Sequence, residues 1–118
     1  MRRASFMQQR DRDRIAHMLD AAQKAVAYAQ QRTRSELEMD ELLRLGLTKL
    51  VEIVGEAAKQ VSESTQREYP EVPWSNAARM RDRLVHHYFA IDVDILWRTV
   101  TEEMPALVHT LDGIDIRT

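Results

Sequence analysis

The sequence predicts an all-α fold, an antiparallel bundle of four main helices. Apolar residues recur at steps of three and four along most of the 118 residues, which is the period of a helix with one buried face. No segment shows the alternation of a strand, and three glycines and three prolines leave few breaks. At this length, with 44% hydrophobic residues, we expect residues 1–118 to form a single helical domain in which residues 1–9 are flexible.

Two helices are expected in the first half of the chain. The first runs from about Arg10 to Arg32 and carries a stripe made of Ile15, Met18, Leu19, Ala22, Val26 and Ala29. The second runs from about Ser35 to Ser64, with a stripe made of Leu43, Leu47, Leu50, Val54, Ala57 and Val61. Leu42, Leu45 and Ile53 lie off that stripe, so this helix is predicted to be central in the bundle or shared with a second subunit. Gly55 costs about 1 kcal/mol in a helix relative to alanine, and close approach of another helix is the usual compensation.

Two more helices are expected after the prolines of "REYPEVPW", which restrict the backbone before Trp74. The third helix is predicted from Trp74 to about His86. Asp92 is placed to cap a fourth, whose stripe is Val93, Leu96, Val100, Met104, Leu107 and Leu111. Pro105 removes the hydrogen bond to the carbonyl of Thr101, so a kink or restart is expected there.

Composition excludes several classes of protein. Cysteine is absent, which excludes disulfides and cysteine catalysis, and no apolar run approaches the 18 residues of a membrane span. The segment "MRRASFMQQRDRDR" has no apolar core, so we expect no signal peptide and a cytoplasmic location. A net charge of −2 gives no overall attraction for nucleic acid. The local arginine excess in residues 1–14 is read as a solvated terminus rather than a phosphate contact.

Arg81 in "RMRDRLVHHY" lies where a regular third helix would have its buried face. At 100° per residue, that face is Trp74, Ala77, Ala78, Arg81, Leu84 and Val85. A buried guanidinium needs a partner or a cleft. Three interpretations follow from the residues: an internal ion pair, for example with Glu56, a side chain that reaches out to solvent, or a site for an anion.

The histidines do not form a metal-binding pattern. His17, His86, His87 and His109 contain no pair at a spacing of three or four residues, and no carboxylate completes a usual site, so no metal or other cofactor is expected. Taken by itself, His86 at a helix end is read as a capping residue more readily than as a catalyst. His86 would meet Arg81 only if the helix ends there or if a second subunit supplies one of them.

Four segments nevertheless resemble one family. "IVGEAAKQVSES", "YPEVPW", "MRDRLVHHYF" and "DILWRTVTEEMPALVHTL" are similar, in this order, to the HepT-like branch of the HEPN superfamily, over about residues 10–112. The family signature is an arginine, a polar residue, a histidine four to six positions after the arginine, and a tyrosine two positions after that histidine. Arg81, Asp82, His86 and Tyr88 match it, and His87 stands where many relatives carry a small or polar residue.

The resemblance implies a dimeric endoribonuclease toxin that needs no metal. In this reading Arg81 and His86 are catalytic, Asp82 and Glu56 support them, and the RNA is cut by attack of its own 2′-hydroxyl. The partner implied is an MntA-type minimal nucleotidyltransferase antitoxin of a type VII toxin–antitoxin system, which silences the enzyme by AMP transfer to Tyr88. The alternatives are a non-catalytic HEPN module that binds a nucleotidyltransferase or a nucleotide, and a purely structural dimer. Without the family, Tyr88 would be read as an aromatic side chain packed on Trp97 or Leu84.

Overall fold

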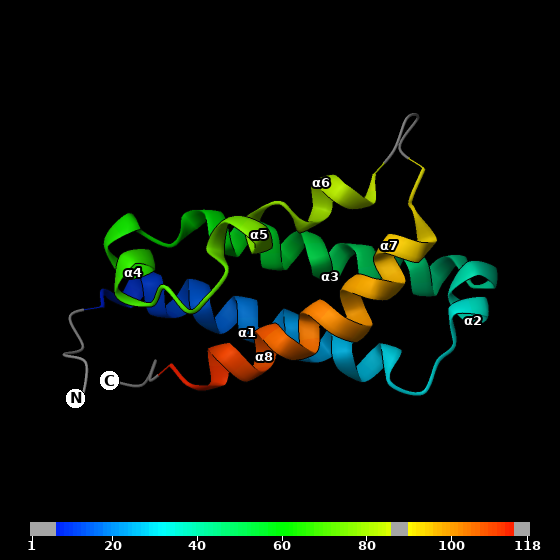
Figure 1. The fold of residues 1–118 in the computed structure, drawn as a ribbon, viewed down its shortest axis with the longest axis horizontal. Helices are drawn as coiled ribbons and strands as arrows, with labels where there is room; N and C mark the ends of the chain where they lie inside the picture. The colour runs from blue at the N-terminus through cyan, green and yellow to red at the C-terminus, as the bar shows by residue number, and fades with distance from the viewer. Residues whose placement is uncertain (1–6, 86–89, 115–118) are drawn as a thin grey trace.

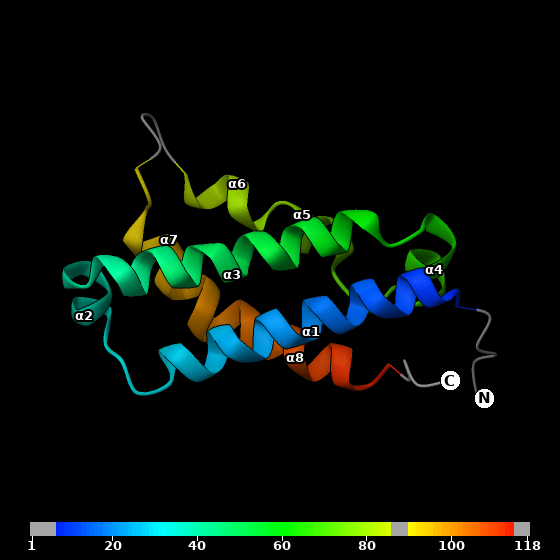
Figure 2. The same ribbon diagram turned by 180° about the vertical axis from the view of Figure 1, so that it is seen from behind.

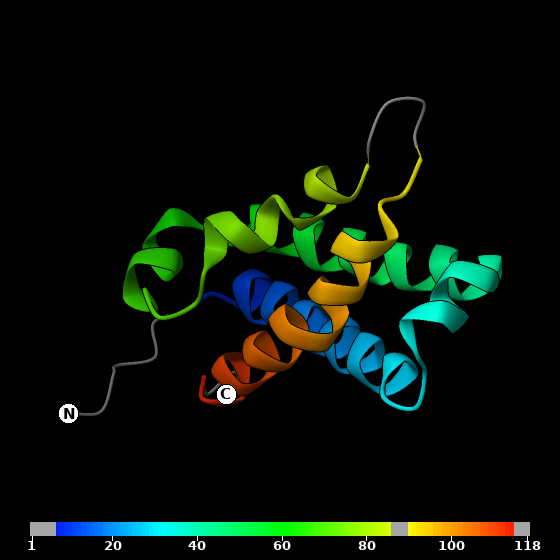
Figure 3. The same cartoon turned by 45° about the vertical axis from the view of Figure 1, so that its right-hand side comes forward.

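Four helical segments that alternate in direction make up the structure, a computed structural model that describes residues 7–85 and 90–114. Helices α1 and α3 run lengthwise through the molecule in opposite directions (Figures 1 and 2). The α5 and α6 segment packs on α3, and α8 lies along α1 on the other side of the bundle (Figure 3). The predicted all-α antiparallel bundle is therefore confirmed, and the described residues form no strand beyond one isolated bridge.

The first predicted helix is confirmed as α1, Gln9–Ala29. Its apolar stripe faces the core, where Ile15, Met18 and Ala22 are fully buried. Met7, just before the helix, is also buried. Most of the other residues expected to be flexible at the N-terminus, residues 1–6, lie outside the described part of the chain.

The second predicted helix is interrupted twice and forms three helices: α2 (Arg34–Met39), α3 (Glu41–Gln60) and α4 (Glu63–Glu68). The prediction of one continuous helix from Ser35 to Ser64 was wrong because Asp40 and Ser62 act as N-caps. Asp40 has an extended backbone, and its carboxylate accepts a hydrogen bond from the Leu43 amide at 3.0 Å. Ser62 accepts from the Thr65 amide and starts α4 in the same way. Both residue types favour a cap over a helix interior.

Helix α3 is the central helix of the fold. One face is buried through Leu47, Val51, Val54, Ala57 and Ala58. A methyl group added at Gly55 would lie 3.3 Å from the carbonyl oxygens of Ala77 and Ala78, so the backbone of α5 crosses α3 at this glycine. The predicted close approach of a helix at Gly55 is confirmed.

The third predicted helix is divided into α5 (Trp74–Ala78) and α6 (Met80–Leu84). Arg79 between them has φ −105° and ψ 5°, outside the helical range, so the prediction of an uninterrupted helix from Trp74 to about His86 was wrong. The far end of that prediction, at His86, lies outside the described residues.

The fourth helix is present with the break that the sequence indicated. It consists of α7 (Val93–Arg98), a π-helical turn η2 (Thr99–Glu103) and α8 (Met104–Asp112). The Asp92 carboxylate accepts from the Ile95 amide at 3.0 Å, which confirms the predicted N-cap. The π-helical turn ends just before Pro105, which stands in the first turn of α8, so the expected restart is also confirmed. None of the helices described here is long and apolar enough to cross a membrane.

A buried carboxylate ties the start of α1 to the start of α4. Asp11 is only 4% exposed and accepts from the Ser62 amide at 3.0 Å, the Ser62 hydroxyl at 2.5 Å and the Thr65 hydroxyl at 2.6 Å. Burial by itself would raise the pKa of Asp11, but these hydrogen bonds outweigh burial and hold the pKa below its ordinary value of 3.8. Asp11 is therefore ionised near neutral pH and contacts residues 51 and 54 positions away in sequence.

Replacing Asp11 by alanine should lower the free energy of unfolding by about 2 kcal/mol at pH 7, because the buried Thr65 hydroxyl and the two donors of Ser62 lose an ionised acceptor. The stabilisation given by a carboxylate with a lowered pKa is complete above about pH 4 and is lost as the pH falls through the lower value of the folded state. Urea unfolding of the wild type should therefore show stability falling below about pH 4, and Asp11→Ala should fall less. The exposed neighbour Asp13 is the control, since Asp13→Ala should change stability by no more than about 0.5 kcal/mol. Equal effects of the two substitutions would contradict this assignment.

Candidate active site

Helix α6 presents three consecutive charged residues to solvent. Met80 and Leu84 anchor the helix in the core, with exposures of 1% and 0%. Arg81, Asp82 and Arg83, between these anchors, are exposed. A five-residue helix held at both ends therefore carries the arginine and the polar residue of the predicted motif on its outer side.

The predicted inward orientation of Arg81 was wrong for the single chain. Its side chain is 46% exposed, because the buried residues of this segment are Trp74, Ala77, Met80 and Leu84 rather than the set that includes Arg81. After the break at Arg79, Met80 takes the core position that a regular helix would give to Arg81, and Arg81 lies beside it.

Arg81 is held against α3 by Glu52. Its Nε donates to Glu52 Oε1 at 3.0 Å, and Lys49 lies 3.8 Å from the other oxygen of the same carboxylate. The hydrogen bond and the charge of Glu52 raise the pKa of Arg81 above its ordinary value. The internal ion pair that the sequence allowed is therefore formed with Glu52 and not with Glu56. Glu56, one turn further along α3, is exposed and pairs with Lys59 at 3.6 Å.

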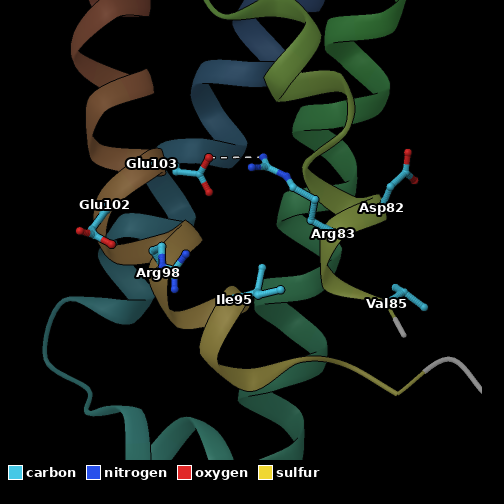
Figure 4. A pocket seen from close by; sticks show the side chains of 7 residues that line it. All are labelled: Asp82, Arg83, Val85, Ile95, Arg98, Glu102 and Glu103. Atoms are coloured by element: carbon cyan, nitrogen blue, oxygen red, sulfur yellow. Dashed lines mark hydrogen bonds and ion pairs between the residues drawn. The ribbon is translucent and has the colours of Figure 1, made fainter. Parts of the chain in front are cut away.

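Arg83 is held on the other side of α6 by Glu103. Arg83 Nη2 donates to Glu103 Oε1 at 3.3 Å, and Asn76 Nδ2 donates to the same oxygen at 3.1 Å (Figure 4 shows the Arg83 contact). The buried Thr99 hydroxyl lies 3.2 Å from Glu103 Oε2 and 2.8 Å from the Ile95 carbonyl, two acceptors for its one proton. Glu103 thus joins α5, α6 and η2 through one carboxylate.

The residues that follow α6 and those that precede α7 lie side by side. Val85 and Ile91 form an antiparallel bridge, and the Asp92 amide donates to the Leu84 carbonyl at 2.8 Å. The remaining motif residues, His86 and Tyr88, and the neighbouring His87 lie between these points and outside the described residues. Their roles stay predictions, as does the alternative packing of Tyr88 on Trp97 or Leu84.

No group of three or more metal-ligating side chains comes together within residues 7–85 and 90–114. The charged groups around α6 are instead two arginines, each with a carboxylate partner from a neighbouring helix. This arrangement holds the guanidinium groups at fixed positions on one helix, and such positioning favours the bidentate binding of a phosphate.

Sequence reasoning missed Glu52 and Glu103. Glu52 lies one turn before Glu56 on the same side of α3, so the spacing of four residues was a signal that could have indicated it. Glu103 is 20 residues from Arg83 in sequence, and only the fold brings these two side chains together.

Comparison with known proteins identifies the family. Residues 18–114 match the family described as Ribonuclease HepT-like. The chain therefore belongs to the HepT-like ribonuclease family of the HEPN superfamily, which confirms the resemblance seen in the sequence and the class of enzyme that it implied.

Several curated proteins are similar over most of their length. A protein of Thermococcus cleftensis named "Probable ribonuclease HepT" is 33% identical over 86% of this chain and 92% of its own length. A protein of Methanocaldococcus jannaschii, named as a candidate RNase, is 31% identical over 82% of this chain and 80% of its own. A third, from Caldanaerobacter subterraneus and also named as a candidate RNase, is 29% identical over 79% of this chain and 83% of its own. The comparison with solved structures found no significant match.

Replacing Glu103 by alanine should lower the free energy of unfolding by about 1–2 kcal/mol, because Asn76 and Arg83 lose a charged acceptor. Thermal unfolding followed by circular dichroism checks this. Glu102→Ala is the matched control, since Glu102 is adjacent and exposed and makes no hydrogen bond or ion pair with any described residue. A Glu103→Ala variant as stable as the control would show that the contacts of Glu103 do not hold α6.

Proposed function

We propose that this protein is a metal-independent endoribonuclease in which Arg81 and His86 cut RNA by attack of the 2′-hydroxyl. The observation that carries the proposal is an exposed arginine, fixed by Glu52, on the helix that leads directly into the histidine of the family motif. Membership of a ribonuclease family supports RNA as the substrate.

The geometry of Arg81 suits a phosphate ligand. Its bond to Glu52 uses Nε, and no hydrogen bond joins either terminal nitrogen to another described residue. Four N–H donors on those two nitrogens are therefore available for a bidentate contact with phosphate oxygens. Glu52 keeps the guanidinium in place without occupying the groups that would meet the substrate.

The reaction needs a proton acceptor, a proton donor and fixed positive charge. A base takes the proton of the 2′-hydroxyl as its oxygen attacks the phosphorus, and an acid gives a proton to the leaving 5′-oxygen. The products are a 2′,3′-cyclic phosphate and a 5′-hydroxyl. Histidine moves protons near neutral pH, so His86 is assigned this part, and Arg81 stabilises the charge on the phosphate oxygens. Asp82 and Glu56 are assigned supporting parts as charged neighbours of Arg81, since both carboxylates help to keep its pKa raised.

Two copies of the chain would supply two copies of each group. Met39, Leu42 and Leu45 are 85%, 82% and 51% exposed, and together with Ile53 they form an apolar stripe along α2 and α3. Ile53, the last residue of this stripe, follows Glu52 in the chain, and Glu52 holds Arg81. Exposed apolar area of this kind supports an interface between subunits, and a two-fold dimer built on it would bring both Arg81 side chains toward one shared cleft.

In the proposed function, modification of Tyr88 silences the ribonuclease. The protein is the toxin of a type VII toxin–antitoxin pair, and its partner is an MntA-type nucleotidyltransferase antitoxin. The Tyr88 hydroxyl attacks the α-phosphorus of ATP, AMP becomes bonded to the tyrosine, and pyrophosphate leaves. The new phosphate charge lies seven residues after Arg81 and would compete there with RNA. RNA and ATP are both cytoplasmic, so the proposal carries a cytoplasmic location.

The alternative is a non-catalytic module that binds a nucleotidyltransferase or a nucleotide. One observation favours it: Arg81 has an internal partner, and an ion pair between helices serves stability without any substrate. Direct assays of RNA cleavage separate the two functions.

RNA cleavage should persist in EDTA and should fall by roughly 10²–10⁴-fold in His86→Ala, because the variant lacks the group that moves protons. Arg81→Ala should lose activity to a similar degree. The matched control is Arg67→Ala, which removes an exposed arginine from α4, at the other end of the bundle. Gel analysis of a labelled RNA measures all four conditions. If His86→Ala cleaves as fast as the wild type, the binding module becomes the better description.

Light scattering at micromolar concentration should give a mass about twice the 13.8 kDa of one chain. Replacing Leu42 and Leu45 by glutamate should convert the dimer to a monomer. The new carboxylates of one subunit would repel those of the other across the two-fold interface. Glu41→Gln is the control, because it changes the charge at the start of α3 without removing apolar area. A wild-type protein that is monomeric at this concentration would refute the shared cleft.

Incubation with ATP, Mg²⁺ and the cognate nucleotidyltransferase should add one or more AMP units to Tyr88, and RNA cleavage should fall as the mass rises. Tyr88→Phe removes only the acceptor hydroxyl, so this variant should stay active and escape silencing. Intact-mass spectrometry measures the addition, and Tyr28→Phe is the control, since Tyr28 is exposed on α1. Normal silencing of Tyr88→Phe would mean that another residue is the switch.

A further inference from the structure

A cleft lies between α6 and the α7–η2 segment, beside the proposed catalytic corner. Its volume is about 670 Å³, within the usual range of small-molecule sites. Seven residues line it, and Figure 4 shows them: Asp82, Arg83, Val85, Ile95, Arg98, Glu102 and Glu103. Val85 is bonded to His86, so this cleft, called here the α6–η2 cleft, begins at the residue before the motif histidine.

Some charged side chains of the cleft have a partner of opposite charge among the described residues and others do not. Arg83 and Glu103 neutralise each other at 3.3 Å. Arg98, Glu102 and Asp82, in contrast, make no side-chain hydrogen bond or ion pair with any residue of the described part of the chain. Figure 4 shows the Asp82 carboxylate turned away from Arg98 and Glu102, so the part of the cleft beside η2 offers one unpaired guanidinium, from Arg98, and one unpaired carboxylate, from Glu102.

This balance indicates what kind of ligand fits. A free anion bound to Arg98 would lie beside the unpaired carboxylate of Glu102, which is unfavourable. A ligand with acceptors and N–H donors on adjacent edges can satisfy a guanidinium and a carboxylate together. Nucleobases have such edges, and their flat faces are apolar enough to lie on Val85 and Ile95, the two half-buried aliphatic residues of the lining.

Among the bases of RNA, guanine suits the pair Arg98 and Glu102. Arginine binds guanine bidentately through O6 and N7, and a carboxylate accepts from its adjacent N1–H and N2–H₂ groups. Adenine has an acceptor at N1 where guanine has a donor, so a carboxylate repels it there. Arg98 and Glu102 are four residues apart across the junction of α7 and η2, and π-helical turns recur at functional sites.

We propose that the α6–η2 cleft binds a guanine base of the RNA next to the phosphate that is cut, with Arg98 and Glu102 as the residues that select it. The proposal rests on the proposed ribonuclease function and adds a sequence preference to it. Glu103 is a positioning residue. Its hydrogen bond with Arg83 keeps that guanidinium from binding the ligand and holds α6 in place at the side of the cleft.

Binding is tested first without catalysis. Titration of ¹⁵N-labelled wild-type protein with guanosine monophosphate should shift the amide signals of Val85, Ile95 and Arg98, and adenosine, cytidine and uridine monophosphates should bind about tenfold or more weakly. Arg98→Ala and Glu102→Gln should each abolish the preference for guanosine monophosphate, while Arg67→Ala, on distant α4, should keep it. Equal shifts with all four nucleotides, or no shifts in the cleft, would overturn the proposal.

Cleavage then supplies an independent measurement. A randomised RNA pool cut by the wild type should show guanine enriched at one fixed position beside the cut, and Arg98→Ala and Glu102→Gln should lose this enrichment with Arg67→Ala retaining it. Cleavage with no preferred base would overturn the guanine site and leave the ribonuclease function standing. Guanosine monophosphate binding in the cleft without any RNA cleavage would refute the proposed function and support the site as a nucleotide site.

Discussion

The close contact between Gly55 and the backbone of α5 is the constraint on which the position of the site depends. The Gly55 backbone approaches the carbonyls of Ala77 and Ala78 so closely that even a methyl group would lie 3.3 Å from both oxygens. Helix α5 is thereby seated on α3, and α6 follows after one non-helical residue, Arg79. Glu52, one turn before Gly55, then lies within 3.0 Å of Arg81. The cost of glycine in a helix interior is offset by an arrangement that fixes the motif arginine.

Two carboxylates from different helices hold α6 from opposite sides. Glu52 on α3 binds Arg81, and Glu103 on η2 binds Arg83. The two ion pairs differ in what they leave free. Arg81 keeps both terminal nitrogens available, whereas Arg83 uses Nη2 for Glu103 and for the carbonyl of Asn76. One arginine is therefore suited to a substrate and the other to support of the helix, although they are two residues apart on the same five-residue helix.

In the proposed function, the groups that bind the substrate, select a base and accept the silencing modification all belong to the region around the end of α6. The overall charge of −2 gives no general attraction for RNA, so recognition must come from local groups. Arg81 would bind the phosphate at the cut, and the α6–η2 cleft would bind the adjacent base. AMP on Tyr88 would add a phosphate close to Arg81, so a single modification would act at the place where the substrate enters. The apolar stripe of Met39, Leu42 and Leu45 offers the surface through which two such corners would be joined.

The sequence by itself determined the fold class, the family and the motif. Apolar periodicity placed α1 and the fourth helix correctly, and local chemistry predicted the cap at Asp92 and the restart at Pro105, because these features depend on neighbours within one turn. It did not predict the caps at Asp40 and Ser62, since their stretch also carries a helical apolar pattern that outweighed the capping signal. Only the tertiary structure decided the direction of Arg81 and its partner. A break at one residue, Arg79, shifts the buried face, and the seating of that break on Gly55 involves residues more than 20 positions apart. The tertiary structure alone also decided the Arg83–Glu103 pair and the cleft beside it. Contacts between distant segments produce no periodic pattern in the sequence from which they could be predicted.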